Sequence, residues 1–317
     1  MGGFGSRKWL WSAGVTLILT TGAVAQVAED AETLPLDATE DGNATAGDPF
    51  VRFTPFTRYT FPSDLDGAND DYRTWRAGFN YLLKKPVSRE AQIKFSLGYE
   101  YSNYDFDRPN TFIAGAAEPF GDIHIIDARL GVEVAVDDEW SWTASGIARF
   151  AGESDVDYSD ADSYGGIFAI QREFNEDFTA SLGVLVATQI EDDELILPAI
   201  TLDWSIDDQW SFVVDGTRGE LRYDYGDGLV AVLGAAYENR RFRLDNDPVK
   251  LGSVVEDTAV PIYIAMRYRA DNSISIDLTG GVLAFQEFEI ENRNGNAGRE
   301  FESDPAPFIG LGVSFNF

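Results

Sequence analysis

One histidine and no cysteine are available for chemistry in this chain of 317 residues. Thiol nucleophiles, disulfides, Cys-ligated metals and a lipidated N-terminal Cys are therefore excluded, and one imidazole is too few for the usual zinc clusters. His124 shares an alternating face with Asp122 and Ile126 at the start of an expected strand, and no G-x-S-x-G nucleophile elbow accompanies it. We expect an interface residue here, and we predict neither a catalytic residue nor a cofactor.

Carboxylates crowd two expected loops, 62–71 and 151–163. Oxygen ligands of this kind are those that Ca²⁺ and Mg²⁺ prefer, although neither loop has the EF-hand spacing. The candidate metal ligands are Asp155, Asp157, Asp160 and Asp162. The alternatives are a solvated, self-repelling loop and divalent-cation bridging to lipid phosphates at a membrane surface.

Charged residues also stand in the middle of expected strands. The candidates for a constriction are Arg76, Arg129, Glu133, Arg267, Arg269 and Asp277. Opposed charges across a pore select solutes by size and charge. The same charges can instead brace a wall through ion pairs, and a single sequence does not pair each arginine with its acid.

The elements that carry these residues alternate with period two. Residues 91–102, 126–136 and 178–187 each place apolar side chains on one face and polar or small ones on the other. Such runs of about ten residues are typical of barrel strands. A soluble β-sandwich has the same period, but charges in mid-strand and aromatic residues beside the turns favour a wet interior with lipid outside.

The expected connections alternate between short turns and long loops, as an up-and-down barrel requires. We place long loops at 62–71, 103–120, 151–163, 245–258 and 287–305. If residues 209–225 form a hairpin within the wall, the barrel has about 14 strands; otherwise it has 12. We favour 14, so the predicted fold is all-β: one antiparallel up-and-down transmembrane barrel over residues 50–317.

The two ends of the chain carry targeting features. Residues 1–25 have a basic start, an apolar stretch and the small-x-small site Ala23-Val24-Ala25, which predicts a secretory signal peptide cleaved after Ala25. Residues 26–49 are acidic without Lys or Arg, which predicts a disordered periplasmic extension. In the last strand, apolar residues at every second position end in Phe317. This ending resembles the signature that the barrel-assembly machinery recognises in outer-membrane proteins.

The overall charge and hydropathy exclude other classes. With 24 Lys+Arg against 54 Asp+Glu, the formal net charge is −30, which argues against binding to nucleic acid. After residue 25 no uninterrupted run of 18 apolar residues occurs. If the protein spans a membrane, a closed barrel is the remaining solution, since every backbone polar group must be paired within the wall.

The stretch 197–244 resembles a family of uncharacterised Gram-negative outer-membrane β-barrel proteins. The shared features are Leu197-Pro198, the hairpin from Trp204 to Trp210, Tyr223, and the strand from Tyr237-Glu238 to Leu244. Glu256-Asp257, Pro261 and Arg267-Tyr268-Arg269 fit the same pattern. The resemblance implies a barrel and names no activity.

These observations predict a bacterial outer-membrane barrel in contact with lipid, and not an enzyme. The favoured function is a passive, porin-like channel for small hydrophilic solutes. The alternative is a structural or surface-interaction barrel with a filled lumen and acidic extracellular loops that bind divalent cations.

Overall fold

The computed structural model describes residues 48–66, 70–107, 119–246, 250–291 and 297–317. The expected signal peptide, and the extension up to residue 47, lie outside them. The strands of the first half are β1 (Phe50–Leu65), β2 (Asp70–Pro86), β3 (Ala91–Phe106), β4 (Asp122–Ala135), β5 (Trp140–Glu153), β6 (Asp162–Asn175), β7 (Phe178–Gln189) and β8 (Asp192–Ser205). Those of the second half are β9 (Trp210–Asp215), β10 (Arg218–Asp224), β11 (Leu229–Ala236), β12 (Glu238–Arg243), β13 (Val254–Arg269), β14 (Ile274–Glu291), β15 (Ala297–Ser303) and β16 (Ala306–Asn316).

These segments form a closed antiparallel barrel of 14 strands. Segments β11 and β12 pair in turn with β13 and are two parts of one strand, and β15 and β16 are likewise two parts of the strand beside β14. Strand β1 pairs with both β2 and β16, which closes the wall. The predicted all-β fold and the favoured strand count are confirmed, and the hairpin β9–β10 lies within the wall.

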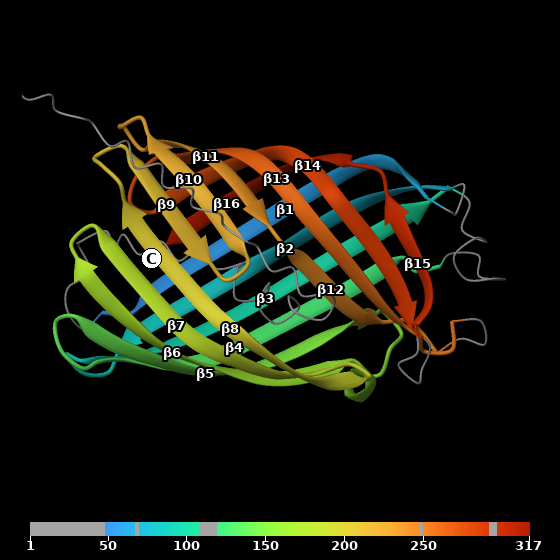
Figure 1. The fold of residues 1–317 in the computed structure, drawn as a ribbon, viewed down its shortest axis with the longest axis horizontal. Helices are drawn as coiled ribbons and strands as arrows, with labels where there is room; N and C mark the ends of the chain where they lie inside the picture. The colour runs from blue at the N-terminus through green and yellow to red at the C-terminus, as the bar shows by residue number, and fades with distance from the viewer. Residues whose placement is uncertain (1–47, 67–69, 108–118, 247–249, 292–296) are drawn as a thin grey trace, which may run out of the picture.

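The connections at one end of the barrel are short turns, and the longer connections lie at the other end, which also has the two-residue turn between β7 and β8; we name these the turn end and the loop end (Figure 1). The first and last strands meet at the turn end, where the backbones of Val51 and Phe317 exchange hydrogen bonds of 3.1 and 2.8 Å. Asp137 shapes one turn by accepting bonds from the amides of Glu139 and Trp140, at 2.9 and 2.8 Å. Asp207 and Asp271 each make the same pair of bonds, as expected for aspartate in tight turns.

A band of apolar side chains covers the outer wall next to the turn end. On β13 these are Ile262, Ile264 and Met266, which are 39–63% exposed. They alternate with inward residues such as Tyr263 and Ala265, which are buried. This is the outward face expected of a wall that contacts lipid.

No helix within the described residues has the length and apolar character needed to cross a bilayer.

Several expected loops are instead extensions of strands. Strand β3 continues to Phe106, β13 already begins at Val254, and β14 runs on to Glu291. With 18 residues, β14 is well beyond the about 9–11 that span a bilayer. The barrel wall therefore extends past the outward apolar band at the loop end.

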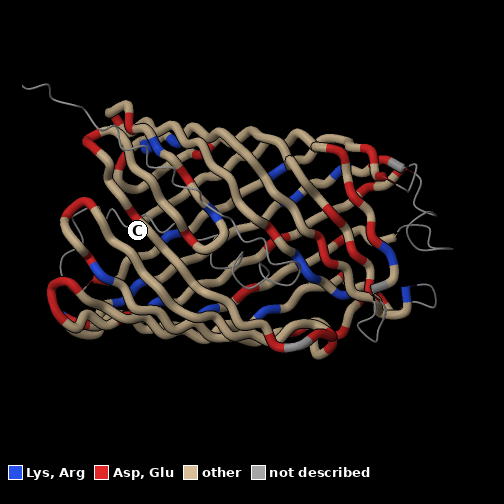
Figure 2. Tube along the Cα trace, viewed as in Figure 1, with Lys and Arg blue, Asp and Glu red and all other residues tan. Residues whose placement is uncertain are grey.

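The polarity of the two faces inverts along that extension. On β3, Tyr99 and Tyr101 face outward and Ser102 faces the lumen, but further on Asp105 is outward while Phe106 is buried inside. The pairing of β3 with β2 has no register shift, so the chemical pattern changes phase while the backbone stays regular. Figure 2 shows acidic residues gathered at both ends of the barrel.

Candidate functional site

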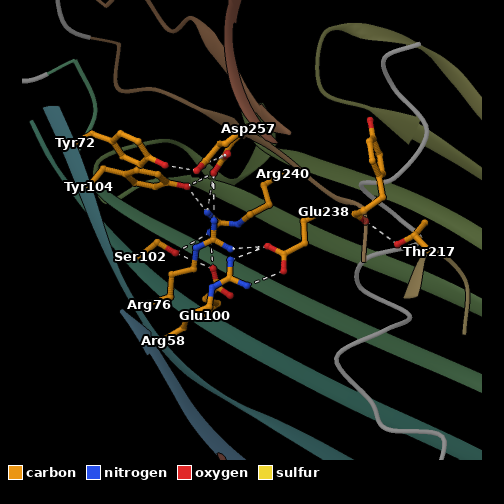
Figure 3. Close-up of polar contacts among 12 residues, drawn as sticks. Arg58, Tyr72, Arg76, Glu100, Ser102, Tyr104, Thr217, Glu238, Arg240 and Asp257 are labelled. Carbon is orange, nitrogen blue, oxygen red and sulfur yellow. Dashed lines mark hydrogen bonds and ion pairs between the residues drawn. The ribbon is translucent and has the colours of Figure 1, made fainter. Parts of the chain in front are cut away.

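Six charged side chains from five strands meet in the lumen, and we call them the charge layer (Figure 3). They are Arg58 of β1, Arg76 of β2, Glu100 of β3, Glu238 and Arg240 of β12, and Asp257 of β13. The strands β1–β3 lie on one side of the lumen, and β12 and β13 supply the opposing groups. The layer therefore bridges the lumen.

The contacts within the layer are shared between partners. Arg58 donates a two-pronged pair of bonds to Glu238, both 2.7 Å long. Arg76 lies between two acids, with its nitrogens 3.2 Å from Glu238 and 3.3 Å from Asp257. Arg240 contacts Glu100, and lies 3.4 Å from Asp257. Each arginine therefore contacts at least one acid, and two acids are shared.

Neutral polar groups complete the layer. The Tyr104 hydroxyl donates to Asp257 at 2.5 Å, and the Gln286 amide donates to the other oxygen of Asp257 at 2.6 Å. Arg240 also donates to the Ser102 hydroxyl at 2.7 Å. These bonds lower the cost of burying Asp257 and Arg240, whereas the Nε atoms of Arg58 and Arg76 are buried without a hydrogen-bond partner.

Three arginines and three acids give the charge layer a formal charge of zero. Their side chains are between 0 and 19% exposed. Removing one member of such a set leaves an uncompensated buried charge and costs about 3–5 kcal/mol. The complete layer is therefore electrically neutral, and the loss of any one of its side chains is costly.

An apolar cluster fills the lumen between the charge layer and the loop end, and we call it the apolar seal. Its core is aromatic: Phe120 lies 5.0 Å from Tyr104, 5.6 Å from Phe242 and 5.8 Å from Phe288, measured between ring centroids. Buried aliphatic residues from β4, β13 and β14 surround them. Among the described residues, the loop end of the lumen is thus occupied by side chains.

Strand β12 supplies residues to both the charge layer and the apolar seal. Its six residues are all buried, and Arg243 at its end pairs with Gly152 of β5. Beyond β12, Lys250 forms an ion pair with Glu153 of β5 at 2.6 Å. These contacts join the end of β12 and the segment after it to the end of β5.

Two cavities described here lie in the lumen nearer the turn end. The first, of about 290 Å³, is lined by charged side chains that include Arg52, Arg218, Glu220 and Arg267. The second, of about 400 Å³, lies along β2–β8 and reaches the hairpin β9–β10. Both therefore belong to the part of the barrel with outward apolar faces.

The six predicted constriction residues do not form one ring. Arg76 belongs to the charge layer, and Arg267 pairs with Asp277 at 3.0 Å in the first cavity. Arg129 and Glu133 line the second cavity, where Glu133 contacts Lys94 and accepts a bond from Gln92 at 3.1 Å. Arg269 is exposed at the end of β13, where its backbone amide donates to Gly228.

Sequence reasoning missed Tyr104, Arg240 and Asp257 as parts of the site. Tyr104 and Asp257 fell in expected loops, because their inward positions belong to the inverted part of the wall. One signal was present: β12 has arginines at 240, 241 and 243, on both of its faces, which a lipid-facing strand does not tolerate.

The four loop aspartates proposed as metal ligands are not brought together. Asp155, Asp157 and Asp160 are exposed, and Asp162 accepts a bond from the Tyr164 hydroxyl at 2.8 Å. Within the described residues, carboxylates converge to within 4.8 Å in two other groups, on the outer face of the loop end: Glu256, Glu289 and Glu291, and Glu287, Glu300 and Glu302. Arg241 already contacts Glu256 and Glu291 of the first group.

His124 lies on the outer face near the loop end. Its Nδ1 is 3.0 Å from the Tyr99 hydroxyl, and its Nε2 is 3.0 Å from the Ser154 hydroxyl. The ring lies among Tyr99 and Tyr101. This placement fits the predicted interface residue.

Several solved structures of outer-membrane channels are similar to this chain. It is similar to the P. putida toluene transporter TodX, with 9% identity, a TM-score of 0.41 and 93% of each chain covered. An outer-membrane channel from Pseudomonas putida F1 has 9% identity and a TM-score of 0.45, covering 88% of this chain and 99% of that one. A Pseudomonas aeruginosa FadL homologue has 10% identity and a TM-score of 0.48, covering 84% and 90%.

No curated protein matches the sequence. The profile of one family, described as a domain of unknown function (DUF6268), matches residues 130–317, which is more than half of the chain. That stretch contains β12, β13 and the hairpin β9–β10, and it covers all the residues on which the sequence resemblance rested. The chain belongs to the DUF6268 family.

Proposed function

We propose that this protein is an outer-membrane channel for small polar solutes, held closed at its loop end by the charge layer and the apolar seal. The proposal includes export by the signal peptide, cleavage after Ala25 and recognition of the last strand by the assembly machinery. The observation that carries it is the contrast within one lumen. Cavities lined in part by charged side chains lie toward the turn end, while paired charges and aromatic rings occupy the loop end.

Strand β12 is the element whose movement opens the channel. It pairs along its length with β13, but across the lumen it is held mainly by side chains of the charge layer. Weakening those contacts should raise the fraction of open channels, by about tenfold for each 1.4 kcal/mol of bias. Small ions and polar solutes are the expected cargo, because Arg52, Arg267 and Asp277 line the first cavity.

The test is conductance across a planar bilayer. Wild-type protein, folded as residues 26–317, should show rare and brief openings, and Arg240→Ala should show openings at least about tenfold more frequent. The matched control is Arg73→Ala, since Arg73 pairs with Asp105 on the outer face with both side chains about half exposed, and such pairs contribute only about 0–1 kcal/mol.

A structural barrel with a filled lumen is the second candidate, and the apolar seal favours it. The two candidates predict different results for the same variant. If Arg240→Ala is folded, as judged by a mobility shift on boiling, yet as silent as wild type, the channel proposal fails and the filled barrel stands.

A further inference from the structure

The barrel wall has a seam beside the hairpin β9–β10. Strand β8 has 14 residues, whereas β9 has six and β10 has seven, and Figure 1 shows the hairpin ending part-way along β8. Strand β9 pairs with β8 only from Thr201 to Ser205, and the last bond runs from the Gly216 amide to the Ile200 carbonyl at 3.0 Å. Within the described residues, β8 from Glu194 to Ala199 pairs along its backbone with β7 and with no other strand.

The other margin of this seam is β12. Its backbone pairs with β13 on one side, and apart from the single pairing of Arg243 with Gly152, no described strand pairs with its other side. Side chains join the margins at the loop end, where Arg241 Nε donates to the Ile190 carbonyl at 2.9 Å. At the hairpin tip the Tyr237 amide donates to the Thr217 carbonyl at 3.2 Å. The seam between β8 and β12 is closed at both ends and has no backbone ladder between them.

The edge of β8 carries a residue suited to staying unpaired. Backbone groups of successive strand residues point to opposite sides, and the Ile200 carbonyl points toward the hairpin. Pro198, two residues away, therefore directs its backbone toward the seam as well. Because proline has no N–H, it removes a donor that the seam would leave without a partner, which is why proline is confined to strand edges.

The second cavity reaches this seam from the lumen. Its lining includes Leu197, which faces inward and is 7% exposed, together with Pro198 and Ile200, which are exposed on the outer face of the same strand. The hairpin tip, Gly216 and Thr217, also lines it. The cavity therefore reaches the edge of β8 at the seam.

The chemistry of the lining changes along the cavity. Near the seam it is apolar, with Ile167, Leu185 and Leu197, and these belong to a buried inward cluster with Ile147 and Leu195. Toward the turn end it is polar, with Lys84, Lys94, Glu133 and Gln171. A small molecule with an apolar body and one polar group matches this gradient.

We propose that the second cavity binds small amphiphilic molecules and that the seam is where they pass between the lumen and the bilayer. The inference rests on the proposed function for the route by which such molecules leave the lumen, but the seam itself can be tested without it. The outer face next to the seam is apolar, with Ile196 67% exposed, so a molecule that leaves there meets lipid.

The absence of cysteine makes site-directed spin labelling direct. Labels at Ala199→Cys and, as a second site, Thr217→Cys report on the seam. Ala235→Cys on the exposed face of β11 is the lipid control, and Thr143→Cys, in the same cavity but on β5, is the lumen control. In phospholipid vesicles, collision of each label with oxygen, which concentrates in lipid, is compared with collision with a water-soluble nickel chelate.

If the seam opens to lipid, the ratio of oxygen collisions to nickel-chelate collisions should be several-fold higher for both seam labels than for the label at Thr143. Adding 1-naphthol should slow the motion of the spin label at Ala199, and this effect should saturate as the concentration rises. The motion of the label at Ala235 should be unchanged. Seam labels that behave like Thr143, or a 1-naphthol effect equal at Ala199 and Ala235, would overturn the inference. Conductance without lipid access would contradict the seam proposal and support the channel proposal. Lipid access in a protein that never conducts would support the seam proposal and contradict the channel proposal.

Discussion

The inner and outer faces of the wall have opposite polarities at the two ends of this barrel. Next to the turn end, Ile264 and Leu278 face outward and charged residues such as Arg267 and Asp277 face the lumen. At the loop end, Phe242 and Phe288 are fully buried inside, and Glu287 and Glu289 lie on the outer face. The first arrangement suits a wall in lipid and the second a wall in water. One continuous sheet thus combines a membrane barrel with a soluble β-structure.

The largest expected effect is in the apolar seal. Phe242→Ala removes a fully buried ring and should lower the free energy of unfolding by about 3–5 kcal/mol. Phe285→Ala is the matched control, because Phe285 is 38% exposed on the outer apolar band and its loss should cost about 2 kcal/mol or less. Urea titration in phospholipid vesicles measures both. Equal losses would mean that the loop end has no core of its own.

Adding a charge to each outer face sharpens the comparison. Ile264→Lys places a cation in the outward apolar band and should cost about 2–4 kcal/mol. Glu289→Lys at the loop end should be neutral or stabilising, because it removes one of three converging carboxylates. The same unfolding titration applies. A large loss from Glu289→Lys would show that lipid extends over the loop end.

The smallest expected effect depends on pH. Glu287 lies beyond the outward apolar band, and burial, followed by the nearby carboxylate of Glu300, raises its pKa from 4.5 to about 7. The folded state thus binds a proton more tightly than the unfolded state, so this contribution is greatest below pH 4.5 and is lost as the pH rises to 7.

The variant Glu287→Gln isolates this contribution. Relative to the variant, the wild type should gain stability when the pH is lowered from 8 to 5, as measured by the urea midpoint at each pH. Parallel pH profiles for the two proteins would show that the carboxylates on the outer face do not interact.

Much of the wall could be predicted from period two. The runs 91–102 and 126–136 lie within β3 and in β4 and the turn that follows it, and the hairpin at 209–225 was the step that brought the count to 14. The loop end could not be predicted in the same way. On β3 the apolar residues move from the outward to the inward positions at Asn103 and Tyr104. In the sequence, this break in the alternation looks the same as the end of a strand. Strand ends were therefore placed too early.

The charge layer shows a second limit. Alternation places Arg58 and Glu238 in the lumen, but they are separated by 180 residues, and their bond depends on closure of the whole sheet. Arg129 and Arg267 have the same pattern in the sequence and lie in different cavities. Side-chain type and spacing therefore identified lumen residues without identifying partners.

The sequence by itself determined the all-β class, the alternating faces of the membrane band and the favoured strand number, because these depend on neighbours within one strand or one hairpin. Only the tertiary structure decided that the end of β12 meets β5, that the wall at the loop end is inverted and that part of β8 pairs with β7 alone. Each of these depends on which strands meet across the barrel, and period two is the same whether lipid, water or another strand lies beyond the face.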